Sequence, residues 1–452
     1  MLNRDDRPAP SGAVEGSVSG ADDPGDELVE RLAASLAELV PAEAGLEIEV
    51  EGRLAAAAAR GPARYRLTVG SRATLARLLA RPSLHALGRA FIEGEWDLIG
   101  DLEAALRLAS DSISALDPRK LVALLELAQR LEQTLPPSPH RAGQPSEAQP
   151  YVGPTTPTTP AIDDRARRAI SYHYDLPVEF WRLWLDDDLL YTCGYYLHPE
   201  DDIHAAQRQK LAVVTTKIRL AAGDRVLDLG CGWGGFLLHA ARAGAHVTGV
   251  TLSEPQAIEA RRRIAEAGQT SRCTLEVCDY RDFRSAASFD AVVALGIMEH
   301  VGEAAYPAFY EAAYRALRPG GLMLAQAITH PAGAQYGTAH ELIHDYVFPE
   351  AMIEPVGTML LHAERAGFEV RDVESLADHY VLTFGQWRAR LEANAAEIRR
   401  LVGDPRYRAF RAYLAGFASE FRRARLNVCQ VLLQKRGPTT RLPLVRPRPP
   451  GA

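Results

Sequence analysis

The chain has 452 residues, of which 47% are hydrophobic and 24% charged, and its formal net charge is -7 at pH 7. This length and composition suffice for more than one hydrophobic core, while the acidic balance argues against a general nucleic-acid-binding protein. No apolar run approaches the ~18 residues of a membrane span, and the N-terminus lacks the pattern of a signal peptide, so any membrane contact is expected to be peripheral.

Residues 1–27 are rich in Gly, Ser, Pro, Ala and Asp without apolar periodicity, and they are predicted to form a disordered leader. A small α+β domain is predicted over residues 28–133. Its elements are recognised by apolar periodicity: helices at 26–40, 72–80 and 101–111, and strands at 46–52 and 63–70. Its acids and arginines are spaced as on an exposed face, so a docking or supporting role is expected.

A Pro-rich tract over residues 134–160 is predicted to be a linker. From 161 to 435 strands alternate with helices, which is typical of a parallel sheet with helices on both faces. Strands are expected at 225–230, 246–251, 274–278, 289–295 and 322–328. Residues 436–452 contain several basic side chains and no acid, and are predicted to form a basic disordered tail.

The stretch VLDLGCGWGG, residues 226–235, reads as a buried strand that ends in a glycine turn before a helix. Gly230 and Gly232 let backbone amides approach a ligand, and Asp228 places an acid below the turn. The stretch also fits the GxGxxG pattern of dinucleotide-binding folds. Its DxGxGxG form, however, resembles class I methyltransferases that use S-adenosylmethionine. This resemblance implies a Rossmann-like α/β fold in which the loop holds the amino-acid part of the cofactor.

Further cofactor residues are implied by the same resemblance. Asp279, in CDYRDF, is expected near the adenine, with Tyr280 beside it. Many class I methyltransferases carry an acid at the end of the second strand for the ribose hydroxyls, but this chain reads GVTLSEPQ there. Thr251, Leu252 and Gln256 are expected to take that role, with Glu254 as an outside candidate.

The segment before the sheet, SYHYDLPVEFWRLWLDDDLLYTCGYY (171–196), is unusually aromatic, and composition alone favours a segment that caps the sheet. Together with DLGCGWGG, GVTLSEPQ and IMEHVG, it closely resembles cyclopropane-fatty-acyl-phospholipid synthases and the related mycolic-acid and fatty-acid methyltransferases. The similarity covers roughly residues 80–435, including FIEGEWDL (91–98). Tyr191 and Thr192 are then expected near the cofactor.

This resemblance implies methyl transfer from S-adenosylmethionine to a cis double bond of a phospholipid acyl chain, through a carbocation that closes to a cyclopropane ring. In the family, a bound bicarbonate removes the proton. The positions that match its ligands are Cys193, Glu299, Ile328 and Tyr380. The family's histidine two residues before the isoleucine is Gln326 here.

Glutamine can donate amide hydrogens to an anion, but it cannot accept and release a proton as histidine does. Bicarbonate binding therefore stays open at Gln326. A cation that loses its proton elsewhere gives a methylene- or methyl-branched chain, and this outcome remains an alternative.

Several of these side chains have simpler interpretations. An acid and a histidine after the fourth strand can bond backbone amides of the next helix, and this structural role is favoured for His300. For Glu299 a site role is favoured, because a carboxylate near a developing cation lowers the barrier. Cys193 could be an ordinary buried thiol, but its aromatic surroundings and its motif favour a site role. The tyrosines of the aromatic segment are candidates for a lid: Tyr172, Tyr174, Tyr191 and Tyr195.

Two rival functions remain: a methyltransferase that acts on a soluble small molecule such as an amine, and a non-catalytic lipid-binding protein. The expected partners are phospholipid acyl chains at the membrane surface, without nucleic acid or metal, and a homodimer is left open. The cysteines, Cys193, Cys231, Cys273, Cys278 and Cys429, lack CxxC spacing, so a cytoplasmic location at the inner face of the membrane is expected.

Overall fold

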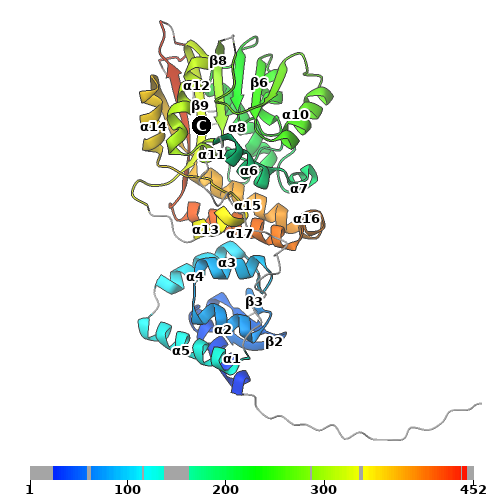
Figure 1. Ribbon diagram of the computed structural model, residues 1–452, viewed down its shortest axis with the longest axis vertical. Helices are drawn as coiled ribbons and strands as arrows, with labels where there is room; N and C mark the ends of the chain where they lie inside the picture. Colours follow the sequence, from blue (N-terminus) through cyan, green and yellow to red (C-terminus); the bar gives the residue numbers. More distant parts are fainter. Residues whose placement is uncertain are drawn as a thin grey trace, which may run out of the picture.

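The computed structural model describes residues 24–58, 63–114, 117–136, 162–285, 288–334, 339–438 and 440–444. Figure 1 shows an N-terminal α+β domain at one end of the long axis and a larger α/β unit at the other, with a layer of helices between them. Within these residues, no helix combines the length and apolar character that a membrane crossing requires.

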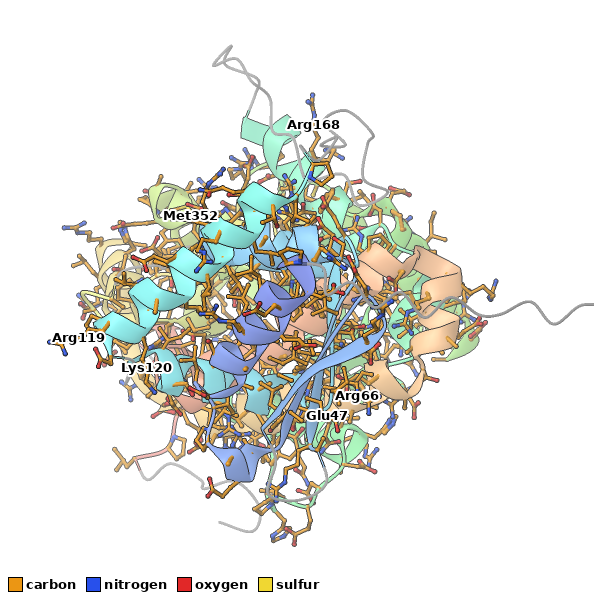
Figure 2. The ribbon with its side chains drawn as sticks, turned by 90° about the horizontal axis from the view of Figure 1, so that it is seen from below. Glu47, Arg66, Arg119, Lys120, Arg168 and Met352 are labelled. Atoms are coloured by element: carbon orange, nitrogen blue, oxygen red, sulfur yellow. The ribbon has the colours of Figure 1, made fainter. Side chains whose placement is uncertain are left out.

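The N-terminal domain contains a four-stranded sheet of order β2-β1-β3-β4, in which β1 and β3 are parallel and the other pairs antiparallel. Its strands are β1 (Leu46–Val50), β2 (Arg53–Ala58), β3 (Tyr65–Val69) and β4 (Trp96–Ile99). Its helices are α1 (Pro24–Ala37), the short 3-10 helix η1 (Ala42–Ala44), α2 (Arg72–Ala80), α3 (Leu84–Ile92), α4 (Leu102–Ser114) and α5 (Pro118–Thr134). Figure 2 shows α1 and α5 side by side over this sheet, with Arg119 and Lys120 at the outer end of α5.

Local sequence explains these helices and corrects one boundary. Ser71 and Ser83 accept the backbone N–H of Thr74 and Ala86, which caps the first turns of α2 and α3. Helix α1 begins at Pro24 and carries Asp26 and Glu27 in its first turn, where their negative charges interact favourably with the positive end of the helix dipole. The predicted leader over residues 1–27 therefore ends too late, because 24–27 are helical. Residues 1–23 and most of the predicted linker lie outside the described residues.

The larger unit is built on a seven-stranded sheet of order β10-β11-β9-β8-β5-β6-β7. The strands are β5 (Arg225–Leu229), β6 (His246–Thr251), β7 (Cys273–Val277), β8 (Phe289–Leu295), β9 (Leu317–Thr329), β10 (Phe368–Ser375) and β11 (Asn427–Lys435). Strands β5 to β9 pair in parallel, and only β11 runs antiparallel to its two neighbours. The predicted mostly parallel sheet is confirmed, whereas β10 and β11 were not predicted.

Helices cover both faces of this sheet, as predicted, and alternate strand residues face each layer (Figure 1). One layer buries Leu211, Leu237, Val293 and Leu324 between the sheet and α8 and α9. The other buries Phe309, Met323 and Met359 against α12 and α14. The helices of this unit are α6 (Ile162–Tyr174), α7 (Val178–Arg182), α8 (Ile203–Lys217), α9 (Gly235–Arg242), α10 (Glu254–Glu266), α11 (Met298–Val301), the 3-10 helix η2 (Glu303–Ala305), α12 (Tyr306–Ala316) and α14 (Val356–Arg365).

The layer between the two domains consists of α13 (Ala339–Tyr346), α15 (Ala377–Ala393), α16 (Ala395–Val402) and α17 (Asp404–Arg422). It is joined to the N-terminal domain by charge pairs. Arg411 donates to Asp97 at 2.9 Å, and Arg422 donates to Glu103 at 2.8 Å. The expectation that the acids of the N-terminal domain form an exposed face is therefore wrong for Asp97 and Glu103, which hold α17. This supports a docking role.

The predicted basic tail is partly ordered. Arg441 donates to both carboxylate oxygens of Asp224, at 2.6 and 2.9 Å, and to Asp290 at 3.0 Å, while Leu442 is buried. The expectation of a disordered tail over 436–452 is therefore wrong at Arg441 and Leu442, because a bidentate arginine–carboxylate pair fixes the chain there.

Candidate active site

A cavity of about 1290 Å³ opens at the carboxyl ends of β5, β6, β7 and β8. The chain passes from β5 outward to β6 and β7 and then returns to β8 beside β5, so this edge is the switch point where open α/β sheets bind ligands. All residues predicted to hold the cofactor line this cavity. They are Tyr191, Thr192, Asp228, Gly230, Gly232, Thr251, Leu252, Gln256, Asp279 and Tyr280.

The glycine turn after β5 forms one wall of the cavity. Gly230 has a φ of +81°, a backbone conformation that favours glycine, and its N–H and that of Cys231 bond the carbonyl of Val250. Below the turn, Asp228 is buried, and its Oδ2 has no hydrogen-bond partner among the described residues. Burial raises the pKa of Asp228 to about 7. An ammonium group in the cavity would supply the partner that this oxygen lacks.

A buried lysine stands behind Thr192 in the wall of the cavity. Lys210 is fully buried in α8, and its Nζ donates to the Thr192 hydroxyl at 2.7 Å. Burial lowers the pKa of Lys210 to about 8. Because the Thr192 oxygen accepts this bond, its own O–H can donate into the cavity. Lys210 was not predicted, although its motif AQRQKLA follows the aromatic segment and a buried lysine needs a partner.

The third wall carries polar groups suited to ribose and adenine. The Thr251 hydroxyl accepts the N–H of Ser253 at 3.2 Å and donates to the Oε1 of Gln256 at 3.0 Å, so the Gln256 amide nitrogen is the group that can donate to a hydroxyl. Asp279 accepts bonds from the backbone N–H of Arg281 at 2.8 Å and from its guanidinium at 2.7 Å. Glu254, the outside candidate, does not line the cavity.

These groups fit the charges of S-adenosylmethionine. Its amino-acid part is a zwitterion, for which Asp228 offers an unpaired carboxylate and Thr192, backed by Lys210, offers a donor. Gln256 and Asp279 offer a donor and a carboxylate to a nucleoside. The roles predicted for these residues remain predictions, while their common location at one cavity is a structural finding.

A second, smaller cavity of about 60 Å³ adjoins the first, and Tyr174, Tyr191, Thr192, Gly296 and His300 line both. A cavity needs only roughly 10–15 Å³ to admit a water, so this one has room for a small anion. Four of the five predicted catalytic residues line it: Glu299, Gln326, Ile328 and Tyr380.

Glu299 is the central polar group of the small cavity. Its Oε1 accepts the backbone N–H of Ile328 at 2.7 Å, while its Oε2 is buried without a hydrogen-bond partner among the described residues. Burial raises the pKa of Glu299 to about 7. The carboxylate is thus fixed by one oxygen and leaves the other for a ligand or a proton. Gln326, two residues before Ile328 in β9, is almost fully buried.

Cys193 does not meet the expectation of a site role for its thiol. The side chain is buried outside both cavities, and its Sγ contacts the carbonyl oxygens of Gly194 at 3.2 Å and Leu376 at 3.8 Å. Burial raises the pKa of Cys193, so the thiol stays protonated and behaves as a core side chain.

His300 and the lid tyrosines differ in part from their predicted positions. His300 bonds the hydroxyl of Tyr174 at 3.1 Å rather than a backbone amide, and burial lowers its pKa to about 4, so it is neutral. Tyr174 and Tyr191 line both cavities, but Tyr172 and Tyr195 line neither. The Tyr195 hydroxyl donates instead to Glu374 at 3.0 Å.

Comparisons with known proteins agree with this geometry. Residues 162–431 match the family model described as mycolic acid cyclopropane synthetase. A probable fatty acid methyltransferase of Pseudomonas putida is 36% identical over 361 residues, which cover 79% of this chain and 84% of the relative. A tuberculostearic acid methyltransferase of Mycobacterium tuberculosis is 31% identical over 375 residues, covering 80% of this chain and 82% of the relative.

Among solved structures, mycolic acid cyclopropane synthase CmaA1, complexed with SAH and CTAB, superposes with a TM-score of 0.57 and 30% identity. The match covers 60% of this chain and 98% of CmaA1. It confirms the class I methyltransferase fold that the DxGxGxG motif indicated. The family match spans more than half of the chain, and the chain therefore belongs to the mycolic acid cyclopropane synthetase family of methyltransferases.

Proposed function

We propose that this protein uses S-adenosylmethionine to alkylate the cis double bond of an unsaturated acyl chain in a membrane phospholipid, with a cyclopropane ring as the product. The observation that carries this proposal is the pairing of the two cavities. The large cavity contains Asp228, whose Oδ2 has no hydrogen-bond partner among the described residues, and the adjoining small cavity contains Glu299, whose Oε2 likewise has none there. Tyr174, Tyr191 and His300 line both cavities.

The size and lining of the large cavity support an acyl substrate. Drug-sized ligands occupy pockets of roughly 300–1,000 Å³, so a cavity of about 1290 Å³ has room beyond the cofactor. Part of its lining is apolar, although Glu350 and Glu354 line the same region: Ile170, Val301, Ala304, Pro349, Met352 and Ile353. The side chain of Met352 is exposed, which suits an entrance for a lipid tail.

The residues around the two cavities would stabilise the carbocation and exclude water. S-adenosylmethionine supplies the methyl group as an electrophile, and the π electrons of the alkene form the new carbon–carbon bond. Tyr174, Tyr191 and Glu299 line the small cavity, where aromatic rings and a carboxylate would stabilise positive charge that develops on the acyl chain. The surrounding aromatic core, which includes Trp181 and Trp184, excludes the water that would otherwise trap a carbocation.

Proton removal completes the reaction. Loss of a proton from the added methyl group lets the remaining electron pair close the ring. Among the protein groups at the small cavity, the Oε2 of Glu299 is the proposed acceptor of this proton. Bicarbonate is proposed as the second acceptor, held there by Glu299, Gln326 and Tyr380.

A second product is favoured by one observation, the glutamine at position 326. Because Gln326 cannot relay a proton, the base at the small cavity is weaker than with the family's histidine. A hydride shift that moves the cation to the methyl-bearing carbon, followed by loss of a methyl proton, then gives a methylene branch (C=CH₂) on the chain instead of a ring. A saturated methyl branch requires a further hydride, which a separate reductase must supply.

The phospholipid substrate and a peripheral position at the cytoplasmic face of the membrane are part of the same proposal. Vesicles of unsaturated phospholipid, incubated with the protein and methyl-labelled S-adenosylmethionine, are expected to gain one CH₂ per acyl chain. Saturated vesicles are the matched control, and a soluble amine is the competing substrate. Ring and methylene products are isomers, which proton NMR separates by the high-field cyclopropane resonances. Label in the amine but not in the lipid would overturn the proposal.

A further inference from the structure

A row of polar side chains crosses three strands beside the small cavity. Glu374 in β10 pairs with Gln430 in β11, and Gln430 pairs with Gln326 in β9. Directly opposed residues of neighbouring strands project from the same face of a sheet, so the three side chains form one line. Gln430 is fully buried and Gln326 almost so.

A lysine anchors the outer end of this row. Lys217, at the end of α8, donates to the Oε1 of Gln430 at 2.8 Å and also to Glu374. Its ammonium group lies 4.0 Å from Asp372, and the other oxygen of Glu374 accepts the Tyr195 hydroxyl at 3.0 Å. The ammonium therefore has acidic partners that hold it in place.

The chemistry of lysine fixes the direction of every hydrogen bond in the row. An ammonium group has only donors, so the atom of Gln430 that faces Lys217 must be its carbonyl oxygen. The NH₂ of Gln430 then faces Gln326, whose Oε1 accepts it at 2.9 Å. With its oxygen taken, Gln326 offers its NH₂ group to the small cavity.

We propose that Lys217 and Gln430 are positioning residues that lock the Gln326 amide with its NH₂ toward the small cavity, so that this cavity presents a donor to an anion beside Glu299. The proposal rests on the proposed function only in taking the small cavity as an anion site. In this chain the donor depends on the hydrogen bonds behind Gln326, because a glutamine amide has one donor end and one acceptor end and can bind an anion in one orientation only, whereas a protonated histidine donates from both ring nitrogens.

Replacing Gln430 by Glu tests the direction of the hydrogen bonds between Lys217, Gln430 and Gln326, because it keeps the size of the side chain at position 430. A carboxylate has no donor, so it accepts from Lys217 and also from Gln326. The Gln326 amide must then turn its NH₂ toward residue 430 and its oxygen toward the cavity, where it repels an anion.

Gln434→Glu is the matched control. Gln434 lies four residues along β11 on the same face, it is buried, and it lines neither cavity. Lys217→Met removes the anchoring donor, and Lys217→Arg restores a donor at the same position.

Two measurements decide the matter. Bicarbonate titrated into the full-length protein in the presence of S-adenosylhomocysteine is expected to bind about tenfold or more weakly to Gln430→Glu, while Gln434→Glu binds as the wild type does. Cofactor affinity is expected to be the same in all variants, because Gln326 does not line the large cavity. Lys217→Met is expected to weaken bicarbonate binding and Lys217→Arg to restore it.

Equal bicarbonate affinity in the wild type and in Gln430→Glu, or no bicarbonate binding by the wild type, would overturn the positioning role. A wild type that binds bicarbonate but transfers no methyl group to acyl chains would instead overturn the proposed function. The positioning role of Lys217 and Gln430 would still be decided by the bicarbonate affinities of the variants.

Discussion

Glu299 accepts the backbone N–H of Ile328 through Oε1 at 2.7 Å, which ties α11, the short helix after β8, to the end of β9. The bond orients the carboxylate so that its other oxygen, which has no hydrogen-bond partner among the described residues, lies in the small cavity. One glutamate therefore joins α11 to β9 and places a carboxylate at the small cavity. Its structural and chemical roles can be separated, because each uses a different oxygen.

The first prediction concerns Glu299→Gln. The glutamine keeps an oxygen for the Ile328 N–H but loses the charge, so cofactor affinity is expected to stay the same while turnover falls by about 10²-fold or more. Burial raises the pKa of Glu299 to about 7, so turnover of the wild type is expected to rise with pH through about 7 as the carboxylate ionises. This step is expected to be absent in the variant.

Steady-state rates with unsaturated vesicles between pH 6 and 8.5 check this prediction. Glu303→Gln, at an exposed position in η2, is the control and is expected to keep the wild-type rate and pH profile. Unchanged turnover in Glu299→Gln would remove Glu299 from the site.

The second prediction concerns Asp228 and protons. Burial raises the pKa of Asp228 to about 7, and a bound ammonium favours the ionised carboxylate. Below pH 7, cofactor binding should therefore release a proton, and affinity should increase as pH rises toward about 7 and then level off. Asp228→Asn is expected to bind about tenfold or more weakly and to release no proton.

Calorimetry at pH 6 in two buffers of different ionisation enthalpy measures the proton release. Asp187→Asn makes the same chemical change at an exposed carboxylate and is expected to behave as the wild type. A buffer-independent heat of binding for the wild type at pH 6 would contradict the assignment of the ammonium group to Asp228.

The third prediction concerns the product. Gln326→His restores the family's residue at the small cavity, and histidine can accept the proton that glutamine cannot. If the wild type makes a methylene- or methyl-branched chain, the variant is expected to shift its product toward cyclopropane. Mass spectrometry and NMR of lipids from an expressing host report the ratio. Identical product profiles would mean that residue 326 does not decide which proton leaves.

The sequence located the cofactor cavity because its residues follow strands with strong apolar runs. Strands β5, β6 and β8 were expected at almost their observed bounds, and the residues after each one meet at a single edge for geometric reasons. Residues such as Asp228 and Thr251 could therefore be placed together although they are far apart in the chain.

The hydrogen-bonded row of Lys217, Gln430 and Gln326 beside the small cavity could not be predicted in this way. Strand β11, NVCQVLLQK, was missed, and its polar Gln430 faces Gln326 across 104 positions of sequence. That pairing depends on the antiparallel register of β11 with β9, which no local pattern reveals. Cys193 shows the opposite error, because its motif suggested the site while its side chain points into the core.

The last prediction tests the ordered part of the C-terminal segment. Asp224 is buried and accepts two hydrogen bonds from the Arg441 guanidinium, which also reaches Asp290. Arg441→Ala leaves the buried Asp224 carboxylate without this partner, so the free energy of unfolding is expected to fall by about 1–3 kcal/mol. Arg436 is exposed and five residues earlier, and Arg436→Ala should change stability by less than about 0.5 kcal/mol. Urea unfolding curves of both variants measure the difference, and coincident curves for Arg441→Ala and the wild type would show that the segment after β11 is not held by this pair.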